Sequence, residues 1–499
     1  MTSGDLQSII PEMICGSLGM LLVVIAPLVR RNAGAAYGTA IAGLLAVLGT
    51  LLLVHPSLTA PFGGTYEVDG VSTFMRIVVV ISALIALPIM SIVMDADDRK
   101  SDVPIFVVFG TLGAMVLCGA DDLALVAVAL AGTSAAVYVL AGIRPQQSRS
   151  REAAVKLIVF AMINNAVMLF GFAMLFGITG SLNFHVMRAA MPGVPLPALT
   201  LALSLIFAGF AFEAVIVPFH EWAPDTYEGA PAASVLWISL APKLAALALM
   251  LRFYSEAFPH SAQTVLGIIA VISMTWGNLA GYVQSDLKRL LAYSGIGHAG
   301  FMLASIATLG HSPGATASFL IYAASYVAMN AAAFAVAALL ERDGGTALRD
   351  LRGLPGRRPG EAIALTIALL SLAGFPPFVG FIAKIVVIQS AFASGAAWLG
   401  ALVAVNAVLA LGYYVRPLVP MWFGPRTRVG AMTWKVGVSL AAAWAFANVV
   451  FGVAPGLLTN PASAATASSR LVGGAKRATA TLDLHSPSIR RDTARLVHR

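Results

Sequence analysis

The sequence is poor in charge. Asp, Glu, Lys and Arg make up 11% of the 499 residues, whereas 59% of residues are hydrophobic and the mean hydropathy is +0.86. Soluble domains carry about 25% charged residues, so this composition excludes a soluble globular protein. Because helices satisfy their own backbone hydrogen bonds in lipid, the sequence predicts an all-α polytopic membrane protein.

Other features are scarce or missing. The two cysteines, Cys15 and Cys118, lie far apart in apolar segments and are interpreted as small buried hydrophobes rather than a disulfide or metal site. The net charge is +8, but no basic face with interleaved aromatics predicts a nucleic-acid partner. The N-terminus has no basic region followed by a small-residue cleavage signal, so the first helix is expected to be retained. His220 and Glu221 begin a zinc-protease-like string, but Pro224 stands where its second histidine would be.

Long apolar runs fill most of the chain. At roughly 20 residues per span we expect about fourteen transmembrane helices, at about 8–29, 35–54, 72–93, 103–119, 121–142, 153–177, 199–220, 231–253, 262–283, 290–310, 315–341, 361–389, 396–422 and 434–455. We divide the chain into helices 1–3 (1–102), a first repeat of helices 4–8 (103–255), a second repeat of helices 9–13 (256–423), helix 14 (424–461) and a basic, flexible C-terminal tail (462–499).

Basic residues concentrate in alternate loops. Loops of the other parity hold little beyond Arg188 and Arg252. By the positive-inside rule the basic side is cytoplasmic and the N-terminus lies outside. The basic C-terminal tail does not fit this orientation, which places it outside, although long tails can cross the membrane regardless of their charge. The basic loops contain Arg30, Arg31, Arg99, Lys100, Arg144, Arg149, Arg151, Lys288, Arg289, Arg342, Arg349, Arg352, Arg357, Arg358, Arg426, Arg428 and Lys435.

Two predicted spans are interrupted by proline. Pro218 breaks helix 7, and the adjacent Pro376 and Pro377 break helix 12. Matching interrupted spans in two halves of a chain indicate an inverted repeat with a binding site at the breaks. Simple proline kinks without a repeat are the alternative.

Ionisable residues lie within these apolar spans. A charge near the bilayer centre costs about 2.5–3.5 kcal/mol on insertion scales, so Glu213, Lys243, His298 and Lys384 are interpreted as functional. Lys156 joins them as a candidate, with snorkelling to the cytoplasmic surface as the alternative. Lysine and glutamate can load and release a proton when burial and a partner charge compete. The five residues therefore predict a proton relay, and isolated buried ion pairs are the alternative for each of them.

Four stretches together resemble one family. They are VPFHEWAPDTYEGAP (217–231), APK (241–243), QSDLKRLLAYSGIGHAGFML (284–303) and LSLAGFPPFVGFIAK (370–384). They are similar to the antiporter-like N subunits of bacterial NADH:quinone oxidoreductase (respiratory complex I), over about residues 70–455. The resemblance implies fourteen helices with two inverted five-helix repeats and proton translocation driven by quinone reduction in neighbouring subunits. It also implies a bacterial plasma membrane location, adjacent antiporter-like and small membrane subunits as partners, no cofactor in this chain, and FMN and iron–sulfur clusters in partner subunits.

The sequence departs from that family at two positions. The family has a glutamate in helix 5 where this chain has Ala131, and a lysine in helix 7 where this chain has Glu213. In one hypothesis Glu213 partners Lys243 and the subunit still moves protons. In another the subunit is structural and does not conduct. A third alternative is a subunit of a multisubunit Na+/H+ antiporter.

Overall fold

Helices form nearly all the regular structure of the computed structural model, which describes residues 3–29, 32–53, 60–94, 100–257, 262–343, 345–425 and 435–469. Within these ranges, extended pairing is confined to three isolated bridges. Eleven helices among the described residues are long and apolar enough to cross a membrane, and three shorter apolar helices accompany them. The all-α membrane fold is confirmed, while the count of fourteen stays a prediction.

The predicted spans coincide with helices, usually to within a few residues. The N-terminal part contains α1 (Ser3–Ser8), α2 (Ile10–Leu28), α3 (Ala33–Leu53), α4 (Pro61–Gly64) and α5 (Gly70–Val93). The next part contains α6 (Val103–Gly119), α7 (Leu123–Ala141), α8 (Ser148–Thr179), α9 (Phe184–Ala190), α10 (Leu196–Ala214), α11 (Trp222–Gly229), α12 (Ala232–Ile238) and α13 (Ala241–Ala257). The last part contains α14 (Ala262–Gly281), α15 (Leu287–Ile306), α16 (Ala315–Arg342), η4 (Leu348–Leu351), α17 (Pro359–Ala373), α18 (Val379–Ala393), α19 (Ala397–Val415), α20 (Leu418–Phe423), α21 (Lys435–Val453) and α22 (Gly456–Ala467).

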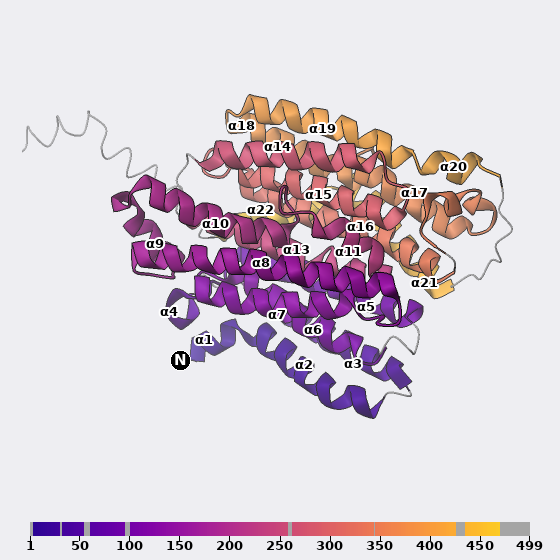
Figure 1. Cartoon of the computed structure of the whole chain (residues 1–499), viewed down its shortest axis with the longest axis horizontal. Helices are drawn as coiled ribbons and strands as arrows, with labels where there is room; N and C mark the ends of the chain where they lie inside the picture. The colour runs from indigo at the N-terminus through magenta and orange to yellow at the C-terminus, as the bar shows by residue number, and fades with distance from the viewer. Residues whose placement is uncertain are drawn as a thin grey trace, which may run out of the picture.

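The long helices run side by side along the long axis of the molecule (Figure 1). Helices α12, α13 and α16 lie in the interior, where nearly all of their side chains are buried. Helices α2, α3, α8, α14 and α21 expose much of their apolar surface. Such outer faces suit lipid or neighbouring membrane subunits, whereas the interior is where buried polar groups need partners within the chain.

Both predicted breaks are present, and a third interruption was not predicted. Helix α10 ends at Ala214 before Val215, whose φ of 61° is left-handed, and α17 ends at Ala373 before Gly374, whose φ is 83°. A left-handed residue that follows the last turn ends a helix, at little cost for glycine and at higher cost for a β-branched residue such as Val215. The third interruption separates α12 from α13 at Ser239 and Leu240, directly before Pro242 in the first turn of α13.

The same local arrangement occurs twice. Asp122 caps α7, and the next residue donates its N–H to the Leu182 carbonyl at 3.0 Å. Asp286 caps α15, and the next residue donates its N–H to the Thr346 carbonyl at 2.8 Å. The first copy adjoins α9, and the second adjoins η4, which contacts α20. Because α9 and α20 lie at opposite ends of the bundle (Figure 1), this arrangement supports an inverted repeat, which stays a prediction as a whole.

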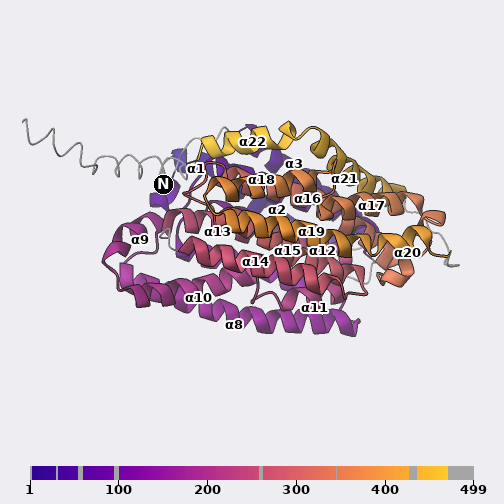
Figure 2. The same ribbon diagram turned by 90° about the horizontal axis from the view of Figure 1, so that it is seen from above.

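The C-terminal region is ordered further than predicted. We expected a flexible tail from residue 462, but α22 runs to Ala467 and lies along one face of the bundle (Figure 2). It packs against α5 and α16, and Ser469 donates a hydrogen bond of 2.9 Å to the Asp69 carboxylate. The prediction was wrong for 462–469 because these small residues fit closely against α5. The rest of the tail, 470–499, lies outside the described residues.

Candidate functional site: a buried lysine, tyrosine and histidine row

Lys243 lies in the first turn of α13, directly after the interruption at Ser239 and Leu240. Its side chain is 1% exposed. The ammonium donates to the Gly295 carbonyl on α15 and, at 3.2 Å, to the Tyr326 hydroxyl on α16. It also lies 4.8 Å from the centre of the Tyr326 ring. The buried lysine is thus held by a carbonyl, a hydroxyl and an aromatic face, and no carboxylate in the described part of the chain pairs with it.

His298 occupies the middle of α15 between two tyrosines. Its Nδ1 lies 2.7 Å from the Tyr322 hydroxyl, and its Nε2 lies 3.1 Å from the Tyr414 hydroxyl. The Tyr414 hydroxyl is also hydrogen-bonded to Ser294 Oγ at 2.5 Å. A neutral imidazole donates from one nitrogen and accepts at the other, so this histidine can take a proton at one side and release one at the other.

Lys384 lies on α18, after the second predicted break. Its Nζ donates to the Ala373 carbonyl at 2.6 Å, in the last turn of α17, and lies 5.2 Å from the centre of the Phe301 ring. The C-terminal end of a helix carries partial negative charge. The break therefore creates a cation site for Lys384, whose side chain is 4% exposed.

Contacts between rings join the two lysines through the histidine. The His298 ring lies 5.3 Å from the Tyr326 ring and 6.2 Å from the Phe301 ring, measured between centres. We call Lys243, Tyr326, His298, Phe301 and Lys384 the central row. The structure brings together three of the five predicted relay residues in this row.

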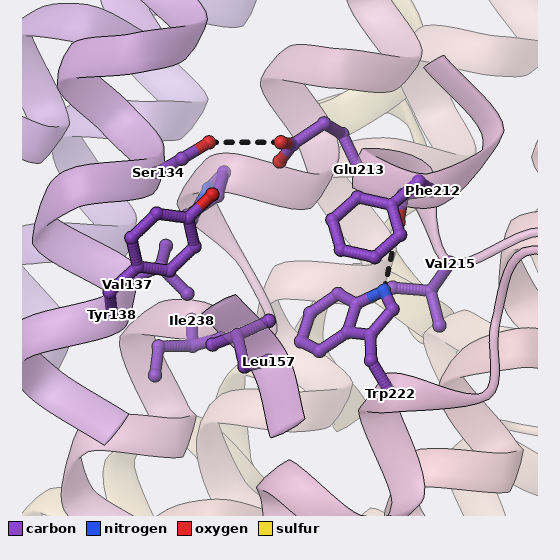
Figure 3. A pocket seen from close by; sticks show the side chains of 10 residues that line it. Ser134, Val137, Tyr138, Leu157, Phe212, Glu213, Val215, Trp222 and Ile238 are labelled. Atoms are coloured by element: carbon purple, nitrogen blue, oxygen red, sulfur yellow. Dashed lines mark hydrogen bonds between the residues drawn. The ribbon is translucent and has the colours of Figure 1, made fainter. Parts of the chain in front are cut away.

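Glu213 does not contact Lys243 in the structure, so the predicted direct pair is corrected. Its carboxylate instead accepts a hydrogen bond of 2.9 Å from Ser134 of α7 (Figure 3). Glu213, Ser134, Tyr138 and Pro242 line a small cavity of about 10 Å³. This volume is near the lower limit for a single water molecule. Since Pro242 precedes Lys243, the cavity lies between the carboxylate and the start of α13.

Lys156 lies away from the central row, at the basic end of the molecule. Its side chain is 42% exposed and pairs with Glu152 at 2.8 Å and Asp225 at 2.9 Å. The structure thus places it at the surface, the alternative to a relay position. Burial alone would raise the pKa of the Asp225 carboxyl, but Lys156 and Arg289 lower it below its ordinary value. These groups line an open cavity of about 220 Å³.

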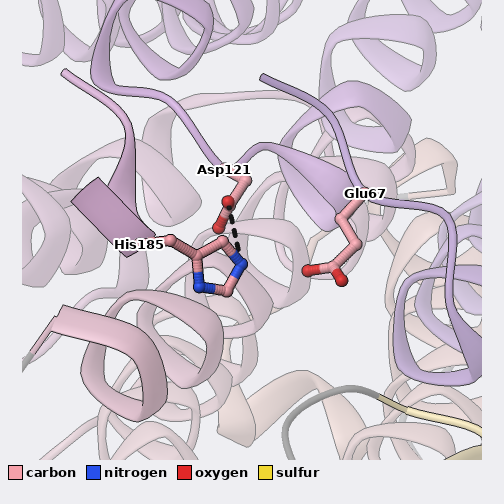
Figure 4. A group of neighbouring side chains, drawn as sticks. All are labelled: Glu67, Asp121 and His185. Carbon is pink, nitrogen blue, oxygen red and sulfur yellow. Dashed lines mark ion pairs between the residues drawn. The ribbon is translucent and has the colours of Figure 1, made fainter. Parts of the chain in front are cut away.

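Carboxylates and arginine form a second polar cluster at the opposite end. Arg252 donates to Glu67 at 2.6 Å and to Asp69 at 2.9 Å. Asp121 lies 3.4 Å from His185 (Figure 4). Glu67, Asp69, Asp121 and Arg252 are almost fully buried. This cluster joins α5 and α13 to the loop before α7.

Sequence comparison identifies the family to which this chain belongs. The family described as "NADH:quinone oxidoreductase/Mrp antiporter, TM" matches residues 120–410. The NADH-quinone oxidoreductase subunit N of Azorhizobium caulinodans is 36% identical over 77% of this chain and 82% of its own length. Subunit N 1 of Solibacter usitatus is 32% identical over 91% of this chain and 95% of its own. This chain belongs to the NADH:quinone oxidoreductase/Mrp antiporter family.

Solved structures agree with this family assignment. A chain of respiratory complex I from Thermus thermophilus is 29% identical, with a TM-score of 0.79 over 90% of this chain and 99% of its own length. A chain of the Mrp complex from Dietzia is 20% identical with a TM-score of 0.79, over 94% of this chain and 97% of its own, and that likeness shows the fold alone. The resemblance to N subunits of the antiporter-like family is confirmed.

Sequence reasoning missed the tyrosines of this antiporter-family site. Tyr322, Tyr326 and Tyr414 lie in apolar runs, where an aromatic residue usually indicates core packing. The signal that could have found Tyr322 and Tyr326 is their spacing of four residues, which places both on one face of α16. Ala131 is exposed on the outer face of α7.

Proposed function

We propose that this chain is the antiporter-like N subunit of a proton-translocating NADH:quinone oxidoreductase and that protons move along the central row. The observation that supports the proposal most is that buried His298 lies between the two buried lysines: Lys243 donates a hydrogen bond to Tyr326, the Tyr326 and Phe301 rings adjoin the His298 ring, and Lys384 lies over the Phe301 ring. Both lysines are buried without a carboxylate partner among the described residues. Lysine is a proton carrier where it is desolvated, and a purely structural role would not require two such groups.

The helix interruptions give the two lysines different surroundings. Lys384 contacts the negative end of α17, whereas Lys243 lies in the first turn of α13, the positive end of that helix. Each such helix-end interaction is worth about 0.3–1 kcal/mol. A positive charge is therefore better stabilised at Lys384 than at Lys243. We infer that a proton that enters at Lys243 passes to His298 and then, through water beside the Phe301 ring, to Lys384, because a phenyl ring cannot itself accept or release a proton.

Glu213 lies beside the central row. It occupies the last turn of α10, the negative end of that helix, where a carboxylate is disfavoured. The small cavity between Glu213 and Pro242 places this carboxyl at the Lys243 end of the central row. We propose that Glu213 exchanges protons with Lys243 through one water molecule rather than through a direct contact.

The assembly follows from the family. We propose that the chain lies in a bacterial plasma membrane, with basic loops in the cytoplasm and the N-terminus outside. Its partners are adjacent antiporter-like and small membrane subunits. FMN and iron–sulfur clusters belong to partner subunits and quinone to neighbouring subunits, so the enzyme activity is that of the complex and this chain serves as a subunit of it.

The proposal is tested by proton pumping per electron in the reconstituted complex. We expect Lys243→Ala and Lys384→Ala to assemble and to lower this ratio. Lys435→Ala, at an exposed position on α21, serves as the control and should leave it unchanged. Unaltered pumping in both buried-lysine variants would favour the structural, non-conducting subunit. Sodium-dependent transport without co-purifying redox subunits would favour a Na+/H+ antiporter subunit.

A further inference from the structure

An open polar cavity lies at the basic end of the molecule, away from the central row. Its volume is about 220 Å³, whereas the cavity beside Glu213 measures about 10 Å³. It therefore admits a small polar group rather than a single water molecule. The charged residues that line it are Arg149, Glu152, Lys156, Asp225, Glu228 and Arg289.

The cavity forms where α11 packs against the start of α8. Gly229 ends α11, and a Cβ added there would come within 2.6 Å of the Arg149 carbonyl oxygen and 2.8 Å of the Ala153 Cβ. Glycine at this position thus allows the two helices to meet closely. Helix α8 lies at the outer edge of the bundle, with α11 beside one of its ends (Figure 2). The cavity therefore lies where membrane lipid can reach it.

Acidic and basic groups alternate around this cavity. Lys156 pairs with Glu152 at 2.8 Å and with Asp225 at 2.9 Å. Arg289 pairs with Asp225 at 2.7 Å and with Glu228 at 2.9 Å. The lining carries three acidic and three basic side chains, so its formal charges cancel. Such a lining favours a ligand that carries one charge of each sign over a simple anion or cation.

Arg149 is the basic group of this lining that is available to a ligand. It is exposed in the first turn of α8 and forms no ion pair with any described residue. The start of a helix carries partial positive charge, and a guanidinium group can donate two parallel hydrogen bonds to a phosphate. Glu152 lies three residues further on the same face, with a 64% exposed side chain. A phosphate at Arg149 and an ammonium at Glu152 would therefore lie side by side.

An apolar stripe leads from the cavity along α8. Val159, Phe160 and Ile163 follow Lys156 at spacings of three, four and seven residues, so they continue the same face of the helix. Their exposed fractions are 52%, 38% and 59%. A lysine at the end of such a stripe keeps its ammonium at the membrane surface. A ligand with a charged head and apolar chains therefore fits this face better than a soluble ion.

We propose that this cavity binds the headgroup of a phospholipid with a primary ammonium, of the phosphatidylethanolamine class. The Arg149 guanidinium donates to the phosphate, and the lipid ammonium donates to the Glu152 carboxylate. The acyl chains lie along Val159, Phe160 and Ile163. Basic pockets between membrane helices bind anionic headgroups on the cytoplasmic side, whereas the acidic groups of this lining favour a zwitterion. Lipid binding here does not require proton movement through the central row.

The test is calorimetric titration of the intact, delipidated complex with short-chain phospholipids. We expect phosphatidylethanolamine to bind more tightly than phosphatidylcholine of the same chain length, whose ammonium has no N–H to donate. Arg149→Gln should weaken the binding of both lipids roughly tenfold, as expected for loss of one charge-assisted hydrogen bond. Glu152→Gln should remove the preference between them. Arg151→Gln is the matched control and should change neither, because Arg151 is exposed on the same turn and bonds to the Pro145 carbonyl.

Three results would overturn this assignment. Equal binding of the two lipids by the wild type would exclude a role for the ammonium. Phosphatidylglycerol or inorganic phosphate that binds as tightly as phosphatidylethanolamine would indicate a site for anions. Unchanged lipid binding in Arg149→Gln, together with altered proton pumping, would make the cavity a proton entrance instead. Each of these results concerns the cavity alone, so the proposed path through the central row would be unaffected by the first two.

Discussion

At the scale of the residue, the buried ammonium of Lys243 is stabilised by uncharged hydrogen-bond partners. Its hydrogen bond to the Tyr326 hydroxyl is the first link of the central row. A buried polar group that loses a partner costs about 1–3 kcal/mol, and a charged group costs more. We expect Tyr326→Phe to assemble into the complex and to lower proton pumping per electron. Tyr282→Phe is the control, because its hydroxyl bonds to the Leu409 carbonyl away from the central row. Equal effects of the two variants would contradict a specific role for Tyr326.

Asp69 offers a residue-scale test of stability against pH. Burial alone would raise its pKa, but the Arg252 charge and hydrogen bonds from Ser72 and Ser469 lower the pKa below its ordinary value. A carboxyl with a lowered folded-state pKa stabilises the fold above its unfolded pKa, and this stabilisation is lost as the pH falls through the folded-state pKa. We expect the thermal midpoint to fall on acidification more steeply in the wild type than in Asp69→Asn. Parallel pH profiles would contradict this assignment.

At the scale of the element, the second break positions Lys384. A Cβ added at Gly374 would come within 2.7 Å of Lys384 Cδ and 3.1 Å of Nζ, and the φ of 83° disfavours any side chain. Gly395 has a similar φ of 80° but open space around it. We therefore expect Gly374→Ala and Gly395→Ala to share a backbone cost of about 1–2 kcal/mol. Only Gly374→Ala should also reduce proton pumping. Reduced pumping in both variants would show that backbone strain alone is responsible.

The sequence predicted most elements for a simple physical reason. Long apolar runs and two proline interruptions identify spanning helices and breaks, so Lys243, His298 and Lys384 could be named in advance. The interruption at Ser239 and Leu240 was not predicted, although Pro242 could have signalled it, because proline is tolerated in the first turn of a helix and breaks its interior. The predicted direct contact between Glu213 and Lys243 was wrong, because hydropathy indicates how deep a residue lies in the membrane and does not show which way its side chain points. Glu213 points towards α7, and only packing shows that.

At the scale of the whole molecule, basic groups gather at one end. Arg349 lies in η4 with an 83% exposed side chain, and Arg188 is exposed on α9 at the other end. We expect an impermeant maleimide to label Arg349→Cys from the cytoplasmic side and Arg188→Cys from the outside. Cys15 and Cys118 are buried and free, as predicted, so the background should be low. Labelling of both positions from one side would contradict the proposed orientation.

His298 lies between the two buried lysines, with the Tyr326 ring on the side of Lys243 and the Phe301 ring on the side of Lys384. The most direct test of the account is proton pumping per electron in the reconstituted complex with His298→Leu, compared with His220→Leu. His220 is a buried histidine that packs edge-on against Trp276, outside the central row. The account predicts continued electron transfer with lowered pumping for His298→Leu and unchanged pumping for His220→Leu. Full pumping in His298→Leu would contradict proton movement through the central row.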